Sequence, residues 1–413
     1  MAVPDRSGRA REEKDVRAIS TSTSTVSVGI HDISTATGHY ALPLETLAAQ
    51  HGIDPQKFLV GIGQEAMSLP AEDEDPVTLA ASAAAPILAR HGAENIRTVL
   101  FATETGVDQS TAAGVYVHSL LGLPRTARTV ELKQACYSGT AALQFAASLV
   151  ARDPSQQVLV IASDIARYAL DSGGEPTQGA GAVAMLVAAD PAVLELDPFS
   201  GVYTRDIPDF WRPNYLSTAL VDGKLSIRAY IDALTGAWRD YREHGGRAFE
   251  DLATICYHQP FTKMAVKAHV ALAEVAGQPV EKDVAAAQLA DTLHYNRLIG
   301  NSYTASMYYG LASLLDHRED LAGQAVGLAS YGSGSVSEFF SGTVRDGYRS
   351  HGRAAETRAG IEAREVIDYA RYRELHEREV PVDGGEHELP RVTRAPFRLA
   401  GYSGHRRLYE RNA

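Results

Sequence analysis

The stretch ELKQACYSGTAAL, from Glu131 to Leu143, places one of the chain's two cysteines between a strand-like run and a long run of small and apolar residues. We expect a helix over residues 136–152, with Cys136 at its amino-terminal end. Free N–H groups and a partial positive charge at such an end favour a thiolate, which predicts a lowered pKa. Cys136 is therefore a candidate nucleophile. A buried cysteine packed as a small hydrophobic residue is the alternative.

The order of predicted elements around this stretch recurs later in the chain. Strands are predicted at 96–103, 129–135, 157–164, 179–190 and 251–260, helices at 110–122, 136–152, 262–277 and 301–318, and two more strands within 325–344. Residue identities do not repeat, but strand, helix, central helix and strand pair follow one another in both parts. Strands that alternate with helices predict an α/β fold with mixed sheets, made of two similar halves.

The length of the chain agrees with this division. A chain of 413 residues is too long for one ordinary core and predicts two domains or one large two-part domain. We assign residues 26–195 to the N-terminal half and residues 196–413 to the C-terminal half. Residues 1–25 are charged and then rich in Ser and Thr, so we expect a disordered N-terminal extension there.

Composition excludes several classes of function. The formal net charge is −12 and no basic stripe is present, which argues against a nucleic-acid partner. Two cysteines cannot build a disulfide framework, and the absence of CxxC and HExxH motifs leaves a metal site without sequence support. Reduced thiols and the lack of a signal peptide predict a cytoplasmic protein. No apolar run approaches the roughly 18 residues of a membrane span.

Two pairs of residues occupy matching positions in this two-part pattern: Glu104 matches His258, and Cys136 matches Asn301. Glu104 follows the first strand of the first half, and His258 ends the matching strand of the second half. Asn301 lies where the second central helix is predicted to begin. If the halves pack about a pseudo-two-fold axis, these four residues meet in one cleft.

Each of these residues has a chemical and a structural interpretation. A carboxylate after an apolar strand, such as Glu104, is partly desolvated, which raises its pKa toward that of a base; a turn or capping role is the alternative. His258 could act as acid, base or oxyanion donor, or be a solvated loop residue. Cys256 shares a strand face with His258 inside an apolar run, which favours core packing.

Two glycine-rich stretches, SGGEPTQGAGAVAM and SYGSGSVSEF, contain G-x-G but complete no nucleotide-binding pattern. Such loops can line a narrow channel or present N–H groups to a developing oxyanion.

Eight ordered stretches together resemble the 3-hydroxy-3-methylglutaryl-CoA synthase family of the thiolase superfamily. They are GIGQEAM, FATETGVDQS, KQACYSGTA, DSGGEPTQGAGAVAM, DFWRPNY, CYHQPFTKM, NRLIGNSYTAS and SYGSGSVSEFFSGT. They cover most of the chain, from about residue 28 to 348. The closing APFRLAGYSGHRRLYE is similar to bacterial members of actinomycete type.

The resemblance implies a five-layered αβαβα fold, a homodimer and a Cys–His–Glu constellation at Cys136, His258 and Glu104. It implies that Asn301 contacts the acyl substrate, and further substrate or CoA contacts at Thr177, Ser226, Lys263, Lys267 and Ser333. The two lysines share one helix face, and a solvated basic edge is their alternative interpretation. The implied reaction condenses acetyl-CoA with acetoacetyl-CoA and water, through an acetyl-cysteine, in the mevalonate pathway of isoprenoid synthesis. Both thioesters are substrates, and no cofactor is implied.

Three alternatives share this fold. A β-branching synthase of polyketide assembly uses the same three residues on acyl groups held by a carrier protein, although an acidic chain is a poor docking surface for an acidic carrier. A ketoacyl synthase of fatty-acid type would not require Glu104. A non-catalytic acyl-binding partner would not require Cys136, His258 and Glu104 together.

Overall fold

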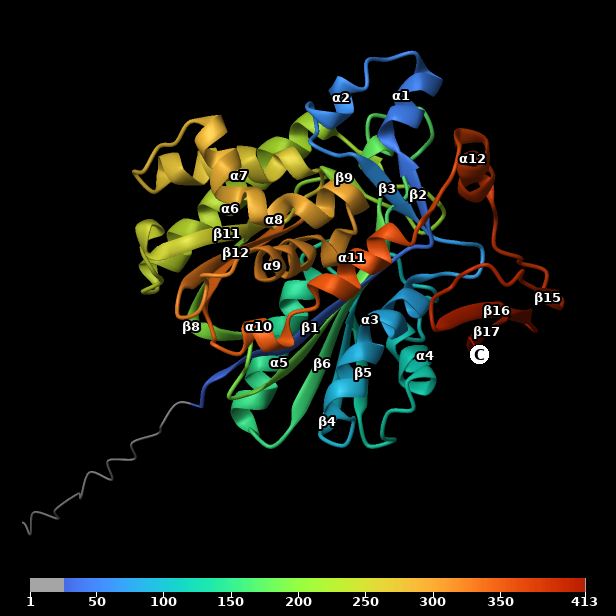
Figure 1. Cartoon of the computed structure of the whole chain (residues 1–413), viewed down its shortest axis with the longest axis horizontal. Helices are drawn as coiled ribbons and strands as arrows, with labels where there is room; N and C mark the ends of the chain where they lie inside the picture. Colours follow the sequence, from blue (N-terminus) through green and yellow to red (C-terminus); the bar gives the residue numbers. More distant parts are fainter. Residues whose placement is uncertain (1–25, 413) are drawn as a thin grey trace, which may run out of the picture.

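The computed structural model describes residues 26–412, so the extension predicted at 1–25 lies outside the described residues. Nine strands of this part form one hydrogen-bonded sheet in the order β11-β12-β13-β8-β1-β7-β6-β4-β5 (Figure 1). Their bounds are β1 Val28–Thr37, β4 Ile96–Ala102, β5 Arg128–Leu132, β6 Gln157–Ile165, β7 Ala180–Ala189, β8 Leu194–Thr204, β11 Leu252–Tyr257, β12 Ala325–Gly332 and β13 Val336–Val344. The predicted strands at 96–103, 157–164 and 179–190 are confirmed.

The sheet consists of two half-sheets that join at β1 and β8. β5, β4 and β6 run parallel, and β7 and β1 continue antiparallel. In the other half-sheet β11 and β12 are parallel, and β13 and β8 continue antiparallel. The junction pairs Gly29 with Glu195 and Ile30 with Leu194. The sheets are therefore mixed, as the sequence predicts.

Helices cover both faces of each half-sheet. Their bounds are α1 Leu44–His51, α2 Gln56–Leu59, α3 Pro76–His91, α4 Ala113–Leu120, α5 Ser138–Arg152, α6 Gly223–Glu243, α7 Thr262–Val275, α8 Lys282–Ile299, α9 Ser306–His317, α10 Tyr348–His351, α11 Ala354–Glu362 and α12 Tyr369–Glu377. Short 3₁₀ turns are η1 Glu175–Thr177, η2 Phe249–Asp251 and η3 Tyr303–Ala305.

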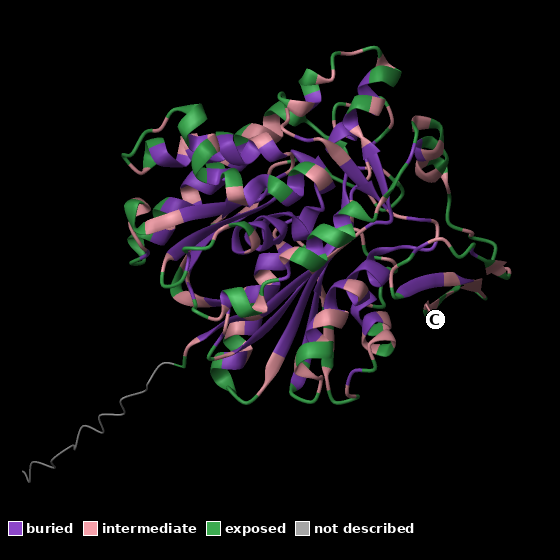
Figure 2. Cartoon of the chain, viewed as in Figure 1, coloured by how far each residue is buried: buried purple, intermediate pink, exposed green. Residues whose placement is uncertain are grey.

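The alternation of side chains along each strand sets the layers. In β6, Val160 packs into the central core with α5 and α9, whereas Leu159 and Ile161 pack outward with α3 and α4. In β11, Cys256 faces the same central core, and Tyr257 packs outward with α6, α7 and α8. Figure 2 shows the strands buried between these helices. The order is helix, sheet, helix, sheet, helix, which confirms the predicted αβαβα fold.

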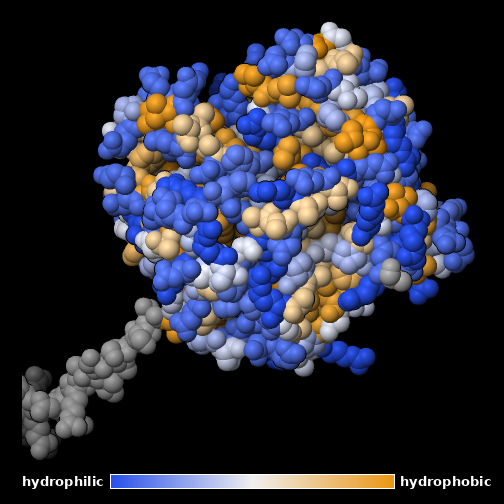
Figure 3. All heavy atoms as spheres, viewed as in Figure 1, coloured by the Kyte–Doolittle hydropathy of each residue, from blue (hydrophilic) through white to orange (hydrophobic). Residues whose placement is uncertain are grey.

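Smaller elements surround this core. A three-stranded sheet joins β14 (Glu365–Val366), β2 (Tyr40–Pro43) and β3 (Ala66–Leu69), and another joins β15 (His387–Glu388), β16 (Phe397–Ser403) and β17 (Arg406–Arg411). The hairpin of β9 (Phe210–Trp211) and β10 (Leu220–Val221) precedes α6. Hydrophilic residues dominate the face drawn in Figure 3, with small hydrophobic patches among them. Among the described helices, none is long and apolar enough to cross a bilayer.

Both predicted central helices begin later than the sequence pattern indicates. The helix expected at residue 136 begins at Ser138, and the helix expected at residue 301 begins at Ser306 after η3. The helix start is delayed because one residue before each helix has a left-handed backbone conformation: Ala135 has φ 42° and Tyr303 has φ 46°. Cys136 and Asn301 therefore lie in turns that lead into α5 and α9.

Candidate active site

The thiol of Cys136 points at the carboxylate of Glu104. Cys136 Sγ donates a hydrogen bond to Glu104 Oε1 over 2.8 Å, and Cys136 is buried. Glu104 follows β4, and Cys136 lies in the turn between β5 and α5. Parallel pairing of β4 with β5 places both residues at the same edge of the half-sheet. The predicted encounter of these two residues is present in the structure.

The pKa values of this pair differ from the expectation for the thiol. Burial raises the pKa of Cys136 well above its usual range, and the neighbouring Glu104 raises it further. The predicted lowering of the thiol pKa is therefore wrong. Cys136 lies two residues before the first helical residue, packed with the apolar side chains of Tyr168, Phe210 and Tyr303. Desolvation and the negative neighbour outweigh the helix terminus.

Burial also raises the pKa of Glu104, to about 8, and the nearby Asp164 contributes to the increase. This direction agrees with the sequence prediction. Because the two groups share a hydrogen bond, they titrate as a coupled pair. Near neutral pH the Cys136 thiol is protonated, and the Glu104 carboxyl group is predominantly protonated as well. Ionised Glu104 becomes available as a base as the pH approaches 8.

Asp164 is a buried carboxylate that holds the turn carrying Glu104, and the sequence reasoning did not identify it. It accepts six hydrogen bonds, from Thr103 Oγ1, the backbone N of Glu104, both N and Oγ1 of Thr105, and both N and Oγ1 of Thr304. Asp164 thus ties the Glu104 turn to η3, which follows Asn301. Its polar side chain within the otherwise apolar run QVLVIASD was the available signal.

His258 follows β11, and its backbone is held on both sides. Its N–H donates to the Ala329 carbonyl over 2.9 Å, and its own carbonyl accepts from Tyr230 Oη over 2.8 Å. The imidazole stacks against the Tyr230 ring at 6.3 Å between centroids. Burial lowers the pKa of His258 to about 3, so the ring is neutral at physiological pH. A neutral imidazole can donate one N–H to a developing oxyanion.

A cavity of about 780 Å³ brings most of the predicted residues together. Its lining includes Cys136, Thr177, Ser226, His258, Asn301 and Ser333. Glu104 is not among the lining residues, but it accepts a hydrogen bond from Cys136, which is one of them. The walls are mainly aromatic and aliphatic, with these polar groups placed among them, which is typical of a pocket for a small organic ligand.

Lys263 and Lys267 lie beside this cavity and do not line it. Lys263 Nζ donates to the Val60 carbonyl over 3.0 Å. Lys267 Nζ lies 5.2 Å from the ring centroid of Phe261, and that ring lines the cavity. Both lysines are in the first turns of α7.

Asn301 joins two segments of the cavity wall. Its backbone N–H donates to the Thr177 carbonyl over 2.9 Å. Its Oδ1 accepts from the Tyr303 N–H over 2.9 Å, which fixes the amide in the turn before η3. The side chain is almost fully buried and lines the cavity.

Asp209 supports the opposite wall and was also missed by the sequence reasoning, although it begins the quoted stretch DFWRPNY. Its Oδ2 accepts from Tyr331 Oη over 2.8 Å and from Ser226 Oγ over 3.1 Å. Its Oδ1 accepts from the Gly334 N–H over 2.9 Å. One buried carboxylate therefore positions Ser226 and the loop that carries Ser333.

Cys256 is located in the central core, as its strand pattern predicts. Burial raises the pKa of its thiol to about 12, so it stays protonated. Among the described residues, Cys136 is the cysteine that reaches the cavity.

Comparison with known proteins gives the family of this chain. The hydroxymethylglutaryl-coenzyme A synthase N-terminal model matches residues 25–192, and the C-terminal model of the same name matches residues 194–276 and 271–374. The chain belongs to the hydroxymethylglutaryl-CoA synthase family. This family consists of acyltransferases of the condensing type, which agrees with the geometry of Cys136, Glu104 and His258.

Individual relatives cover most of the chain. Hydroxymethylglutaryl-CoA synthase of Enterococcus faecalis is 42% identical over 349 residues, which span 84% of this chain and 91% of that protein. The polyketide biosynthesis 3-hydroxy-3-methylglutaryl-ACP synthase of Bacillus subtilis is 34% identical over 77% of this chain and 80% of its own length. A crystal structure of HMG-CoA synthase complexed with CoA superposes with a TM-score of 0.87, at 38% identity, over 94% of this chain and 100% of that one.

Proposed function

We propose that this chain condenses acetyl-CoA with acetoacetyl-CoA and water to give 3-hydroxy-3-methylglutaryl-CoA and CoA, through an acetyl thioester on Cys136. The observation that carries this proposal is the 2.8 Å contact of the Cys136 thiol with Glu104 beside a cavity that His258 also lines. The expected role is a step of the mevalonate pathway, which makes isoprenoid precursors, in the cytoplasm. The actinomycete-like subtype and the division at residues 195 and 196 stay predictions.

The first step transfers the acetyl group to the enzyme. The Cys136 sulfur attacks the thioester carbonyl of acetyl-CoA, a new C–S bond forms, and the CoA thiolate leaves and takes up a proton. The thiol has to lose its own proton in this step. That proton passes to the departing CoA sulfur, so the transfer balances without a free Cys136 thiolate.

The second step forms the carbon–carbon bond. Ionised Glu104 takes a proton from the methyl group of acetyl-Cys136, and the resulting enolate carbon attacks the ketone carbon of acetoacetyl-CoA. The ketone oxygen becomes an alkoxide. Neutral His258 stabilises that charge by donating an N–H hydrogen bond, and Glu104 holds the proton that the alkoxide can take up. Water then cleaves the thioester, which releases the product and restores the Cys136 thiol.

The remaining predicted residues are proposed to bind the substrates. Asn301, Thr177, Ser226 and Ser333 line the cavity and offer polar groups to the acyl chains or the pantetheine arm. Lys263 and Lys267 lie beside the cavity on α7, where their charges could meet CoA phosphates near the opening.

A homodimer is part of this proposal. β5 is one of the two edge strands of the nine-stranded sheet, and its Val130 is 41% exposed. Phe145 on α5, a helix in contact with β5, is 54% exposed. An open strand edge beside exposed apolar side chains supports a two-fold interface in which both copies present the same surface.

The second candidate function is condensation onto an acetoacetyl group that is bound to a carrier protein. The 34% identity with the Bacillus subtilis synthase supports it. The net charge of −12 argues against docking of an acidic carrier. A product assay that offers acetoacetyl-CoA and an acetoacetyl-carrier protein side by side tests both. We expect the CoA substrate to react at least about 100-fold faster, as judged by kcat/KM. Preferential use of the carrier substrate would assign the chain to β-branching.

The pH dependence of condensation tests the role of Asp164. Because ionised Glu104 is required, kcat/KM for acetoacetyl-CoA is expected to rise with pH through a midpoint near 8. The charge of Asp164 raises the pKa of Glu104, so Asp164→Asn should lower that pKa and move the midpoint to lower pH. Asp164→Glu, which keeps the charge, is the matched control. An unchanged midpoint in a folded Asp164→Asn protein would contradict the electrostatic role.

Replacement of the imidazole separates the two half-reactions. His258→Ala removes the N–H donor to the alkoxide, so we expect condensation to slow by about 100- to 1000-fold. Acetylation of Cys136 should change only a few-fold, because this step does not form the alkoxide. Rapid-quench measurement of each half-reaction checks this prediction. An equal loss in both half-reactions would mean that His258 acts in acyl transfer as well.

A further inference from the structure

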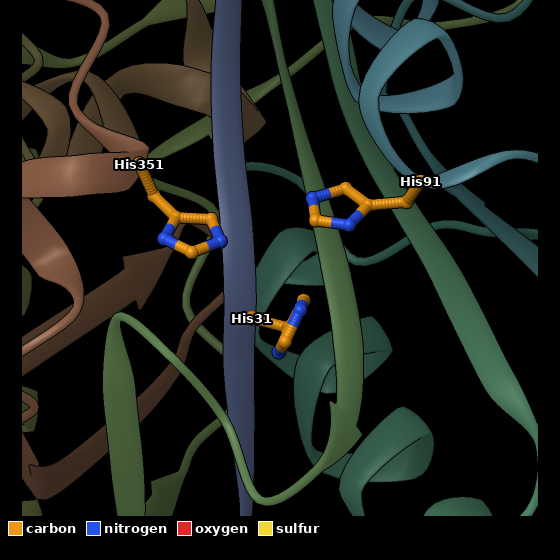
Figure 4. Close-up of side chains that lie close together, drawn as sticks. All are labelled: His31, His91 and His351. Atoms are coloured by element: carbon orange, nitrogen blue, oxygen red, sulfur yellow. The ribbon is translucent and has the colours of Figure 1, made fainter.

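Three histidines from distant parts of the chain converge outside the cavity. His31 belongs to β1, His91 ends α3 and His351 ends α10 (Figure 4). One ring nitrogen from each lies within 4.8 Å of the others. Ring centroids are separated by 5.0 Å between His31 and His91, 5.4 Å between His31 and His351, and 5.8 Å between His91 and His351.

The backbone at His31 is shaped to place this side chain. The register of β1 against β7 shifts between Ile30 and Asp32, which pair with the consecutive residues Val187 and Leu186. His31 is therefore the extra residue of a β-bulge. Bulges change the direction of a side chain and are common at functional positions. In a regular strand, the side chains of residues 30, 31 and 32 would point to alternate faces of the sheet, and the bulge breaks this alternation at His31.

One nitrogen of the His31 ring lacks a hydrogen-bond partner among the described residues. Its Nδ1 is buried and has no hydrogen-bond partner within residues 26–412. A buried polar nitrogen without a partner costs free energy, and a ligand that accepts its lone pair would recover that cost.

The other two rings are oriented by hydrogen bonds on one nitrogen each. His91 Nε2 lies 2.9 Å from Asp32 Oδ2, and Asp32 is fully buried. His351 Nδ1 lies 3.0 Å from the Gly347 carbonyl oxygen. When these nitrogens carry the protons, the second nitrogen of each ring is left with a lone pair. A carboxylate or carbonyl partner on one nitrogen is the arrangement that orients metal-binding histidines.

The chemistry of the available ligand atoms indicates which kind of ion would bind. Arg90 Nη1 and Arg353 Nη2 donate to Asp32 Oδ2 over 3.1 and 2.6 Å, so positive charge is already present. The Asp32 carboxylate is therefore already paired, and the cluster offers imidazole nitrogens in place of the oxygen ligands that Mg²⁺ and Ca²⁺ need. Zn²⁺ forms strong bonds with neutral imidazole nitrogens.

We propose that His31, His91 and His351 form a binding site for one transition-metal ion of the Zn²⁺ class. Small side-chain rotations would bring the three nitrogens to the roughly 2.0–2.1 Å bonds of a zinc site, with water as a fourth ligand. The ion would link β1, α3 and α10. None of the three histidines lines the catalytic cavity, so the site stabilises the fold and takes no part in condensation.

The test is a zinc titration of chelator-treated full-length protein against a chromophoric competitor. We expect one Zn²⁺ per chain and a rise in Tm of about 2 °C or more at saturation. Since Cys136 could itself bind zinc, the titration is repeated with Cys136→Ala, which should retain the ion and the Tm rise.

Two histidine variants test whether zinc binds at the cluster of His31, His91 and His351. His351→Gln removes a ligand from a short surface helix and should weaken zinc binding at least about 100-fold. His244→Gln changes an exposed histidine away from the cluster and should bind as the wild type does. If His351→Gln does not fold, His31→Gln provides the same measurement. Zinc binding that survives both His31→Gln and His351→Gln, or that is lost in Cys136→Ala, would overturn the proposal.

Discussion

Cys136→Ala is expected to reduce formation of 3-hydroxy-3-methylglutaryl-CoA by at least about 10⁴-fold, because the covalent acetyl intermediate cannot form. The Cys136 sulfur lies at the cavity and is hydrogen-bonded to Glu104, so no other described thiol can replace it. Intact-mass analysis after incubation with acetyl-CoA should show one added acetyl group on the wild type and none on the variant.

Cys256→Ala is the matched control for this experiment. Cys256 is buried in the central core, with the pKa of its thiol raised to about 12, so it should not be acetylated. The control protein should still gain one acetyl group, with only a modest loss of stability from the smaller side chain. Acetylation of Cys136→Ala would place the nucleophile elsewhere. A wild type that gains no acetyl group would favour the non-catalytic acyl-binding alternative.

Glu104→Gln is expected to retain acetylation and to lose condensation by roughly 10²- to 10⁴-fold, which is the usual contribution of a positioned general base. The amide oxygen can still accept the Cys136 S–H, so the geometry of the site is preserved. Ionised Glu104 is one of the groups that raise the pKa of Cys136, and the neutral amide removes that contribution. Acetyl transfer should therefore proceed at a similar or higher rate near neutral pH.

Exchange of the acetyl methyl protons with solvent provides a direct measurement of this step. The acetylated wild type should exchange these protons, and Glu104→Gln should not. Glu131→Gln is a suitable control, since Glu131 is a partly buried carboxylate on β5 that accepts from the Ala113 N–H outside the cavity lining. If Glu104→Gln fails to acetylate, then Glu104 activates the thiol, and its assignment to proton abstraction alone is wrong.

Local sequence patterns determined the positions of several strands, the fold class and the raised pKa of Glu104. Apolar runs that alternate with helical segments predicted β4, β6 and β7 and the mixed α/β class, because strand and helix periodicities are properties of a few neighbouring residues. The position of Glu104 after an apolar strand also predicted a raised pKa, since burial of the strand implies desolvation of the residue at its end. Motif resemblance identified Cys136, Glu104 and His258 as a set.

Tertiary structure alone decided the state of the thiol and the support of the site. The pKa of Cys136 is raised mainly because the sulfur is buried among Tyr168, Phe210 and Tyr303, and further because β4 and β5 bring Glu104 within hydrogen-bond distance. Asp164 acts through donors that lie far from it along the chain, and the cluster of His31, His91 and His351 joins three distant elements. Electrostatic interactions depend on distance and burial, and neither follows from residue spacing when the partners belong to different strands and helices.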